Sequence, residues 1–165
     1  MTEAADPPRG AVARIARASA WLGGLALLFV AGLTSVSVLS RWLTSQPVRG
    51  DVEMISLGSG LAVMLCLAYG TLMRTNILVD SFTNWLPARV NQMLDAFWNL
   101  IWAIAALFLA RGMAIGASEA LANRTTTIGM LGVPIWWAIA IGALCLLATA
   151  AAGFYWTWRF LRGHA

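Results

Sequence analysis

Few residues of this chain have side chains that could carry out a reaction or hold a metal or a haem. The single histidine, His164, lies one residue from the C-terminus, so a pair of axial histidines cannot form within the chain. There is no HExxH motif, and no pair of carboxylates lies within the long apolar runs. Cys66 and Cys145 each lie midway along such a run, where small buried side chains are expected rather than a disulfide. The sequence therefore predicts no catalytic residues, no metal site and no cofactor.

The elements that must position the remaining polar residues are long apolar segments. Of the 165 residues, 60% are hydrophobic and 11% are charged, and the mean hydropathy is +0.75. A soluble domain has about a quarter of its residues charged. The net charge is +4, and all 11 basic residues are arginines that lie singly or in pairs between uncharged runs, as in proteins whose basic residues orient membrane spans. This pattern excludes a soluble domain, a disordered chain and a nucleic-acid-binding module.

Four uncharged runs predict four membrane-spanning helices. A hydrocarbon core about 30 Å thick needs about 20 helical residues. The run between Asp95 and Arg111 supplies only about 22 Å, so we expect this helix to continue past Arg111, whose side chain extends to the surface. Pro134 suits the first turn of a helix, so we place the start of the last span there. We therefore predict an all-α integral membrane protein with one membrane domain and spans at about residues 18–40, 54–73, 96–118 and 134–158.

Between the second and third spans, apolar residues recur every three or four positions over residues 75–95. This spacing is typical of an amphipathic helix lying in the membrane interface, interrupted or restarted at Pro87. A solvated loop is the alternative interpretation.

The arginines also predict the orientation. With four spans both termini lie on one side of the membrane. That side would hold seven arginines and the other side four, namely Arg41, Arg49, Arg111 and Arg124. The positive-inside rule therefore predicts that both termini are cytoplasmic.

Two groups of residues are candidates for contact with a partner. The first is a stripe of small residues at four-residue spacing in the second span: Gly58, Ala62, Cys66 and Gly70. Such stripes let helices approach closely in a membrane, either within this bundle or against a partner. The second group is the set of charges in and beside the first outer loop: Arg41, Arg49, Asp51 and Glu53. A glutamate at the mouth of a span is costly unless it is paired or hydrated, so we expect Glu53 to pair with Arg41 or to contact a partner subunit.

Three stretches of the sequence resemble a known family. They are Ser40-Arg41-Trp42 with Pro47 and Gly50 to Met54, then Arg74 to Asp80 with Leu86 to Arg89, and finally Thr126 to Trp136. In this order and spacing they resemble the small (Q-type) membrane subunits of tripartite ATP-independent periplasmic (TRAP) transporters. The resemblance covers nearly all of residues 15–160.

The resemblance implies a role in transport rather than a reaction. In this family a large membrane subunit holds the substrate and sodium sites and moves by an elevator-type motion, while a periplasmic binding protein delivers the solute, typically an organic acid. The resemblance implies that the small subunit acts as a static scaffold in the bacterial inner membrane. It braces the large subunit and helps to form the surface on which the binding protein docks. The expected partners are the large subunit, the binding protein and the lipid bilayer.

Two other interpretations remain open at this point. The chain could be a membrane anchor or assembly subunit of an unrelated complex, or a small exporter acting as a homo-oligomer. Ionisable residues would be expected at mid-membrane depth in an exporter, whereas here they lie at the ends of the runs.

Overall fold

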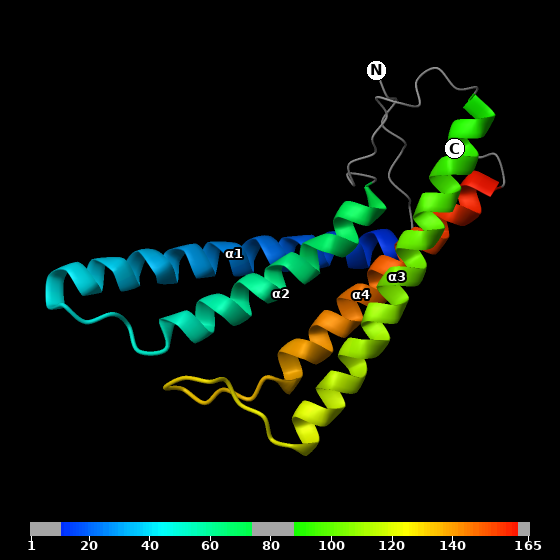
Figure 1. The fold of residues 1–165 in the computed structure, drawn as a ribbon. Coiled ribbons are helices and arrows are strands. Elements are labelled where there is room, and N and C mark those ends of the chain that lie inside the picture. The colour runs from blue at the N-terminus through cyan, green and yellow to red at the C-terminus, as the bar shows by residue number, and fades with distance from the viewer. Residues whose placement is uncertain (1–10, 74–87, 162–165) are drawn as a thin grey trace.

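The computed structural model describes residues 11–73 and 88–161, which form four helices and two connecting loops (Figure 1). The helices are α1 (Ala11–Thr44), α2 (Asp51–Leu72), α3 (Ala88–Ala122) and α4 (Trp136–Leu161). Each contains a stretch long and apolar enough to cross a membrane. The predicted fold class, an all-α membrane protein with four spanning helices, is confirmed.

The helical form of these segments follows from the membrane environment, because a backbone without water must satisfy its own hydrogen bonds. The hydroxyl groups inside the spans also find local acceptors one turn earlier. Thr34 donates to the carbonyl oxygen of Val30 at 2.8 Å, and Thr149 donates to that of Cys145 at 2.9 Å. These polar side chains are therefore accommodated without water.

The four helices form two antiparallel hairpins, α1 with α2 and α3 with α4, which meet where α2 packs against α4 (Figure 1). The start of α1 and the end of α4 lie at one end of the molecule, here called the terminal end. The connecting loops 45–50 and 123–135 lie at the opposite end, here called the loop end. An even number of spans with this arrangement places the first and last helical turns on the same side of a membrane.

Small residues bring α3 and α4 together. Ala103 is fully buried, and a Cβ added to Gly153 of α4 would lie 3.0 Å from its Cβ. Trp156 fills the space between α3 and α4 near the terminal end, where it packs with Ala96. Close approach of these two helices therefore depends on alanine and glycine, as expected where lipid supplies no hydrophobic driving force.

The third helix differs from its prediction at the start. It continues past Arg111 to Ala122, as the short uncharged run required, but it begins at Ala88. Residues 88–95 of the predicted interfacial segment are therefore the first turns of α3. The rest of that segment, with the interruption at Pro87, lies outside the described residues.

The fourth helix also begins later than predicted, at Trp136 rather than at Pro134. Pro134 forms an isolated antiparallel bridge with Thr126, in a hairpin closed by hydrogen bonds from Thr127 N to Val133 O and from Ile135 N to Thr125 O. This bridge does not need an N–H from Pro134, so the proline is accommodated in the loop. The carbonyl oxygen of Ile135 then accepts the N–H groups of Ala138 and Ile139 and starts the helix.

Candidate functional site

Among the residues that the structure describes, the only buried carboxylate belongs to Glu53, in the first turn of α2, which is 9% exposed. Its Oε2 accepts a hydrogen bond from the hydroxyl of Thr127 at 2.6 Å, and its Oε1 accepts one from the N–H of Leu131 at 3.2 Å. Both donors belong to the 123–135 loop. Glu53 therefore ties the first hairpin to the loop of the second.

Local geometry in the 123–135 loop makes room for this carboxylate. A Cβ added to Gly129 would overlap the Glu53 side chain, so a glycine is needed there. Gly132 has a φ of 57°, a left-handed conformation that favours glycine and turns the chain back. The N–H of Val133 donates to the Thr127 hydroxyl oxygen at 3.0 Å, which orients that hydroxyl toward Glu53. Hydrogen bonds to a carboxylate, such as those that Glu53 accepts from Thr127 and Leu131, are stronger than bonds between neutral groups.

A second contact at the loop end also depends on a glycine. Gly50, with a φ of 75°, precedes α2, and a Cβ at this position would overlap the side chain of Leu131. The two loops therefore touch directly, and Leu131 contributes its N–H to Glu53 and its side chain to Gly50.

Asp51 has a different role, because it links α1 to α2. Its Oδ2 accepts a hydrogen bond from the hydroxyl of Ser37, which is 5% exposed, and its Oδ1 accepts one from the N–H of Val52 at 2.7 Å. A carboxylate in the first turn is also favoured by the helix dipole. Asp51 is half-buried and is therefore part of the α1–α2 contact.

The two arginines of the predicted group remain on the surface. Arg41, in the last turn of α1, and Arg49, in the connecting loop, are both exposed. Glu53 accepts hydrogen bonds from Thr127 and Leu131 in place of a pairing with Arg41, which is one of the two alternatives that the sequence offers for it. The four charges of the loop region thus separate into two that hold the protein together and two that face outward.

Three members of the small-residue stripe lie along α1. A Cβ added to Gly58 would lie 2.6 Å from Cγ2 of Val30. A Cβ added to Gly23 of α1 would lie 2.7 Å from Sγ of Cys66 and 3.1 Å from the carbonyl oxygen of Ala62. Gly70, the fourth member, is half-buried near the end of α2. The stripe is therefore occupied, over most of its length, by a helix of the same chain.

Sequence reasoning did not find Thr127 and Leu131, the two residues that bind Glu53. The positions are 74 and 78 residues from Glu53 along the chain, a separation over which periodicity carries no information. The Thr126 to Trp136 stretch carries part of the resemblance to a family. Its glycines and threonines are typical turn residues, but they do not indicate a carboxylate ligand.

Taken together, the fold and these contacts define a multi-pass membrane protein whose two helical hairpins are joined through polar contacts at the loop end. Residues 30–163 match the family described as tripartite ATP-independent periplasmic transporters, DctQ component. The chain belongs to this family and is therefore a small membrane component of a TRAP transporter. No curated protein and no solved structure matches the chain significantly.

The family assignment favours one of the interpretations left open by the residues. DctQ is a family of transporter components and not a family of enzymes, which favours transport over an anchor for an unrelated complex. It also agrees with four helices that can span a membrane.

Proposed function

We propose that this chain is the static scaffold of its transporter, bracing the large membrane subunit during sodium-driven, binding-protein-dependent uptake of an organic acid. It would lie in the bacterial inner membrane with both termini in the cytoplasm. The loop end would then face the periplasm, where the binding protein arrives. The seven-to-four distribution of arginines supports this orientation.

The observation that carries the scaffold proposal is that the two hairpins are joined at both ends. At the loop end, Glu53 of α2 binds Thr127 and Leu131. At the terminal end, the indole N–H of Trp156 donates to the carbonyl oxygen of Leu72 at 2.9 Å. Because the first hairpin is bonded to the second at both ends, relative motion of the hairpins would have to break these hydrogen bonds. Such a structure suits a support better than a moving part.

The partners in this proposal are the large subunit and the periplasmic binding protein. Large apolar side chains are exposed on the outer faces of α1 and α3, among them Leu28, Phe29, Phe108 and Leu109. These faces are available to lipid and to the helices of a large subunit. In the proposed orientation, the exposed Arg49 of the 45–50 loop would be on the side from which a binding protein approaches.

The experiment is a disulfide lock between the two hairpins. Leu72 and Ala152 are both buried and pack together, so L72C and A152C introduced in a background of Cys66→Ala and Cys145→Ala would join α2 to α4. The complete transporter is reconstituted in vesicles, and sodium-driven uptake is measured with and without oxidation. A scaffold predicts the same uptake in both states.

The controls separate the lock from general damage. Each single cysteine variant is oxidised in parallel and should transport as before. The small subunit reconstituted alone should take up nothing. If the oxidised double variant loses uptake and recovers it on reduction, the hairpins must move during transport, and the static role is wrong.

A further inference from the structure

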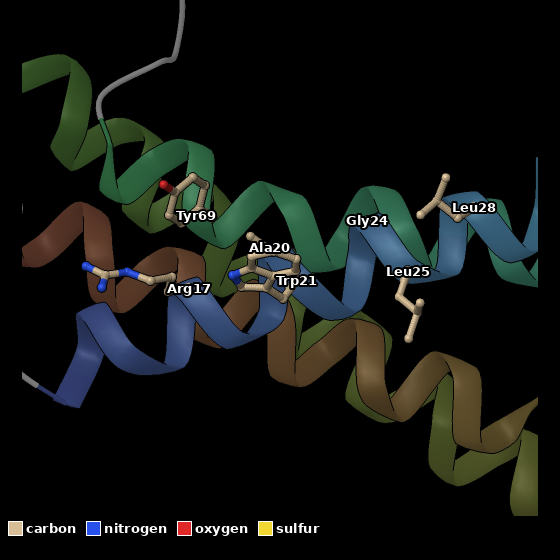
Figure 2. A pocket seen from close by; sticks show the side chains of 7 residues that line it. All are labelled: Arg17, Ala20, Trp21, Gly24, Leu25, Leu28 and Tyr69. Carbon is tan, nitrogen blue, oxygen red and sulfur yellow. The ribbon is translucent and has the colours of Figure 1, made fainter.

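A surface groove runs along α1 from Arg17 to Leu28 and has Tyr69, in the last turn of α2, beside its end nearer the terminal end (Figure 2). Its volume is about 490 Å³. One residue of α2 and six of α1 line it: Tyr69, and Arg17, Ala20, Trp21, Gly24, Leu25 and Leu28. The groove belongs neither to the loop-end contacts nor to the α1–α2 stripe described above.

The lining of the groove is polar at one end and apolar along the rest. Arg17 is the first residue of the stretch of α1 that can span a membrane, and it is exposed. Figure 2 places Arg17 and Tyr69 toward one end, with Trp21 beside them and Leu28 at the far end. Tyrosine and tryptophan favour the headgroup level of a bilayer, where one part of the ring is apolar and another is hydrated. The groove therefore runs from the interface toward the bilayer interior.

The length of the groove matches one leaflet. Arg17 and Leu28 are separated by eleven helical steps, which at 1.5 Å each is about 16 Å. Half of a hydrocarbon core about 30 Å thick is about 15 Å. A lipid with its headgroup beside Arg17 would thus lay an acyl chain over the whole length of the apolar lining.

We infer that this groove binds one anionic phospholipid, with its phosphate against the Arg17 guanidinium and one acyl chain along Trp21, Gly24 and Leu28. A guanidinium offers a planar set of donors that suits phosphate oxygens. Basic pockets beside transmembrane helices are known to select anionic headgroups. An apolar helix of another protein could cover Leu25 and Leu28 but would offer nothing to Arg17, so charge complementarity favours the lipid.

Gly24 provides a way to fill the groove without disturbing the fold. A Cβ added at this position has no atom within 4 Å, so a larger side chain there would project into the open groove. Gly32, two turns further along α1, is equally open and does not line the groove. Gly24→Leu and Gly32→Leu therefore form a matched pair of variants.

The test uses the complete transporter in detergent and native mass spectrometry. Phosphatidylglycerol, phosphatidylcholine with the same chains, and inorganic phosphate are titrated separately. We expect one phosphatidylglycerol bound per small subunit, weaker binding of phosphatidylcholine and no binding of phosphate alone. Arg17→Gln should weaken phosphatidylglycerol binding about five-fold, and Gly24→Leu should remove binding of both lipids. Arg14→Gln, at an exposed position outside the groove, and Gly32→Leu should bind as the unchanged protein does.

Two results would overturn the assignment. The first is equal binding of phosphatidylglycerol by the unchanged protein, Arg17→Gln and Gly24→Leu. The second is loss of the large subunit from Gly24→Leu on purification with an unchanged lipid count, which would show that a protein helix occupies the groove. Because lipid is counted without measuring uptake, the result is independent of whether the scaffold proposal holds.

Discussion

The indole N–H of Trp156 donates a hydrogen bond to the carbonyl oxygen of Leu72, 2.9 Å away and 84 positions earlier in the chain. The bond joins the last turns of α4 to the end of α2, where helix carbonyls lack partners of their own. Both residues are nearly inaccessible to solvent. An aromatic side chain thus caps a neighbouring helix at the point where the two hairpins meet.

We predict that Trp156→Phe destabilises the protein by about 1–3 kcal/mol, because the Leu72 carbonyl is left buried without its donor. The shift in unfolding temperature of the purified transporter in detergent measures this effect. Trp42→Phe is the control, since Trp42 is 81% exposed and the same ring loss should change little. Equal shifts for the two variants would contradict the structural role of Trp156.

A double-mutant cycle tests the contact between Glu53 and Thr127. Glu53→Ala should cost about 1.5–3 kcal/mol, as expected for a hydrogen-bonded carboxylate, and Thr127→Val should cost less. Because each variant already breaks the shared bond, the double variant should be less destabilised than the sum, by about 0.5–3 kcal/mol. Thermal unfolding together with protease cleavage of the 123–135 loop gives the measurement.

Arg41→Ala is the control for this cycle. An exposed surface residue should change stability by no more than about 0.5 kcal/mol. If Arg41→Ala instead lowers the stability as much as Glu53→Ala, and the two substitutions are strongly coupled, then Glu53 is paired with Arg41. The contact of Glu53 with the 123–135 loop would then not be the stabilising one.

The small-residue contact between α1 and α2 predicts a difference between two neighbouring positions. Ala62 is fully buried, and its carbonyl oxygen would lie 3.1 Å from a Cβ added to Gly23 of α1. Ala62→Leu should therefore force the two helices apart and lower the free energy of unfolding by about 1–3 kcal/mol. Gly60→Leu adds a side chain where no atom lies within 4 Å and should be tolerated. Unfolding temperature and recovery of the assembled transporter are compared. Full stability of Ala62→Leu would show that this part of the stripe is not closely packed.

Charge reversal should distinguish Arg49 from Asp51. Arg49 is exposed, so Arg49→Glu should leave assembly of the transporter intact. It should reduce uptake when the binding protein is limiting. An exposed charge contributes under about 1 kcal/mol to such an interaction, and added salt weakens this contribution further. Asp51→Arg removes the acceptor of Ser37 and should lower the unfolding temperature as well. Uptake at two ionic strengths and thermal unfolding are the measurements. No change in uptake with Arg49→Glu at low salt would remove Arg49 from the proposed docking surface.

The orientation is tested by reporter fusions. A reporter that is active only in the cytoplasm should be active when fused after Ala165 and inactive when inserted in the 45–50 loop. The reason is the excess of arginine on the side of the termini. The opposite pair of activities would invert the proposed topology and place the loop end in the cytoplasm.

The sequence by itself determined the class of protein, the number of spans and the continuation of α3 past Arg111, because the thickness of a bilayer and the cost of burying charge act on local segments. Local rules were less reliable at the boundaries. Pro134 satisfies the requirements of a first helical turn, but it equally suits the bridge to Thr126 that the loop adopts.

Only the tertiary structure decided which polar groups meet. From the sequence, Arg41 is an available cation for Glu53, and Asp51 is one more charge of the same loop region, with no partner indicated. The packing of α2 on α4 brings the 123–135 loop over the start of α2, so Glu53 binds Thr127 and Leu131, while Asp51 faces Ser37 of α1. Side chains two positions apart in a helix point in directions that differ by about 200°. Which of the two directions faces a neighbouring element depends on how the helices pack and not on residue type.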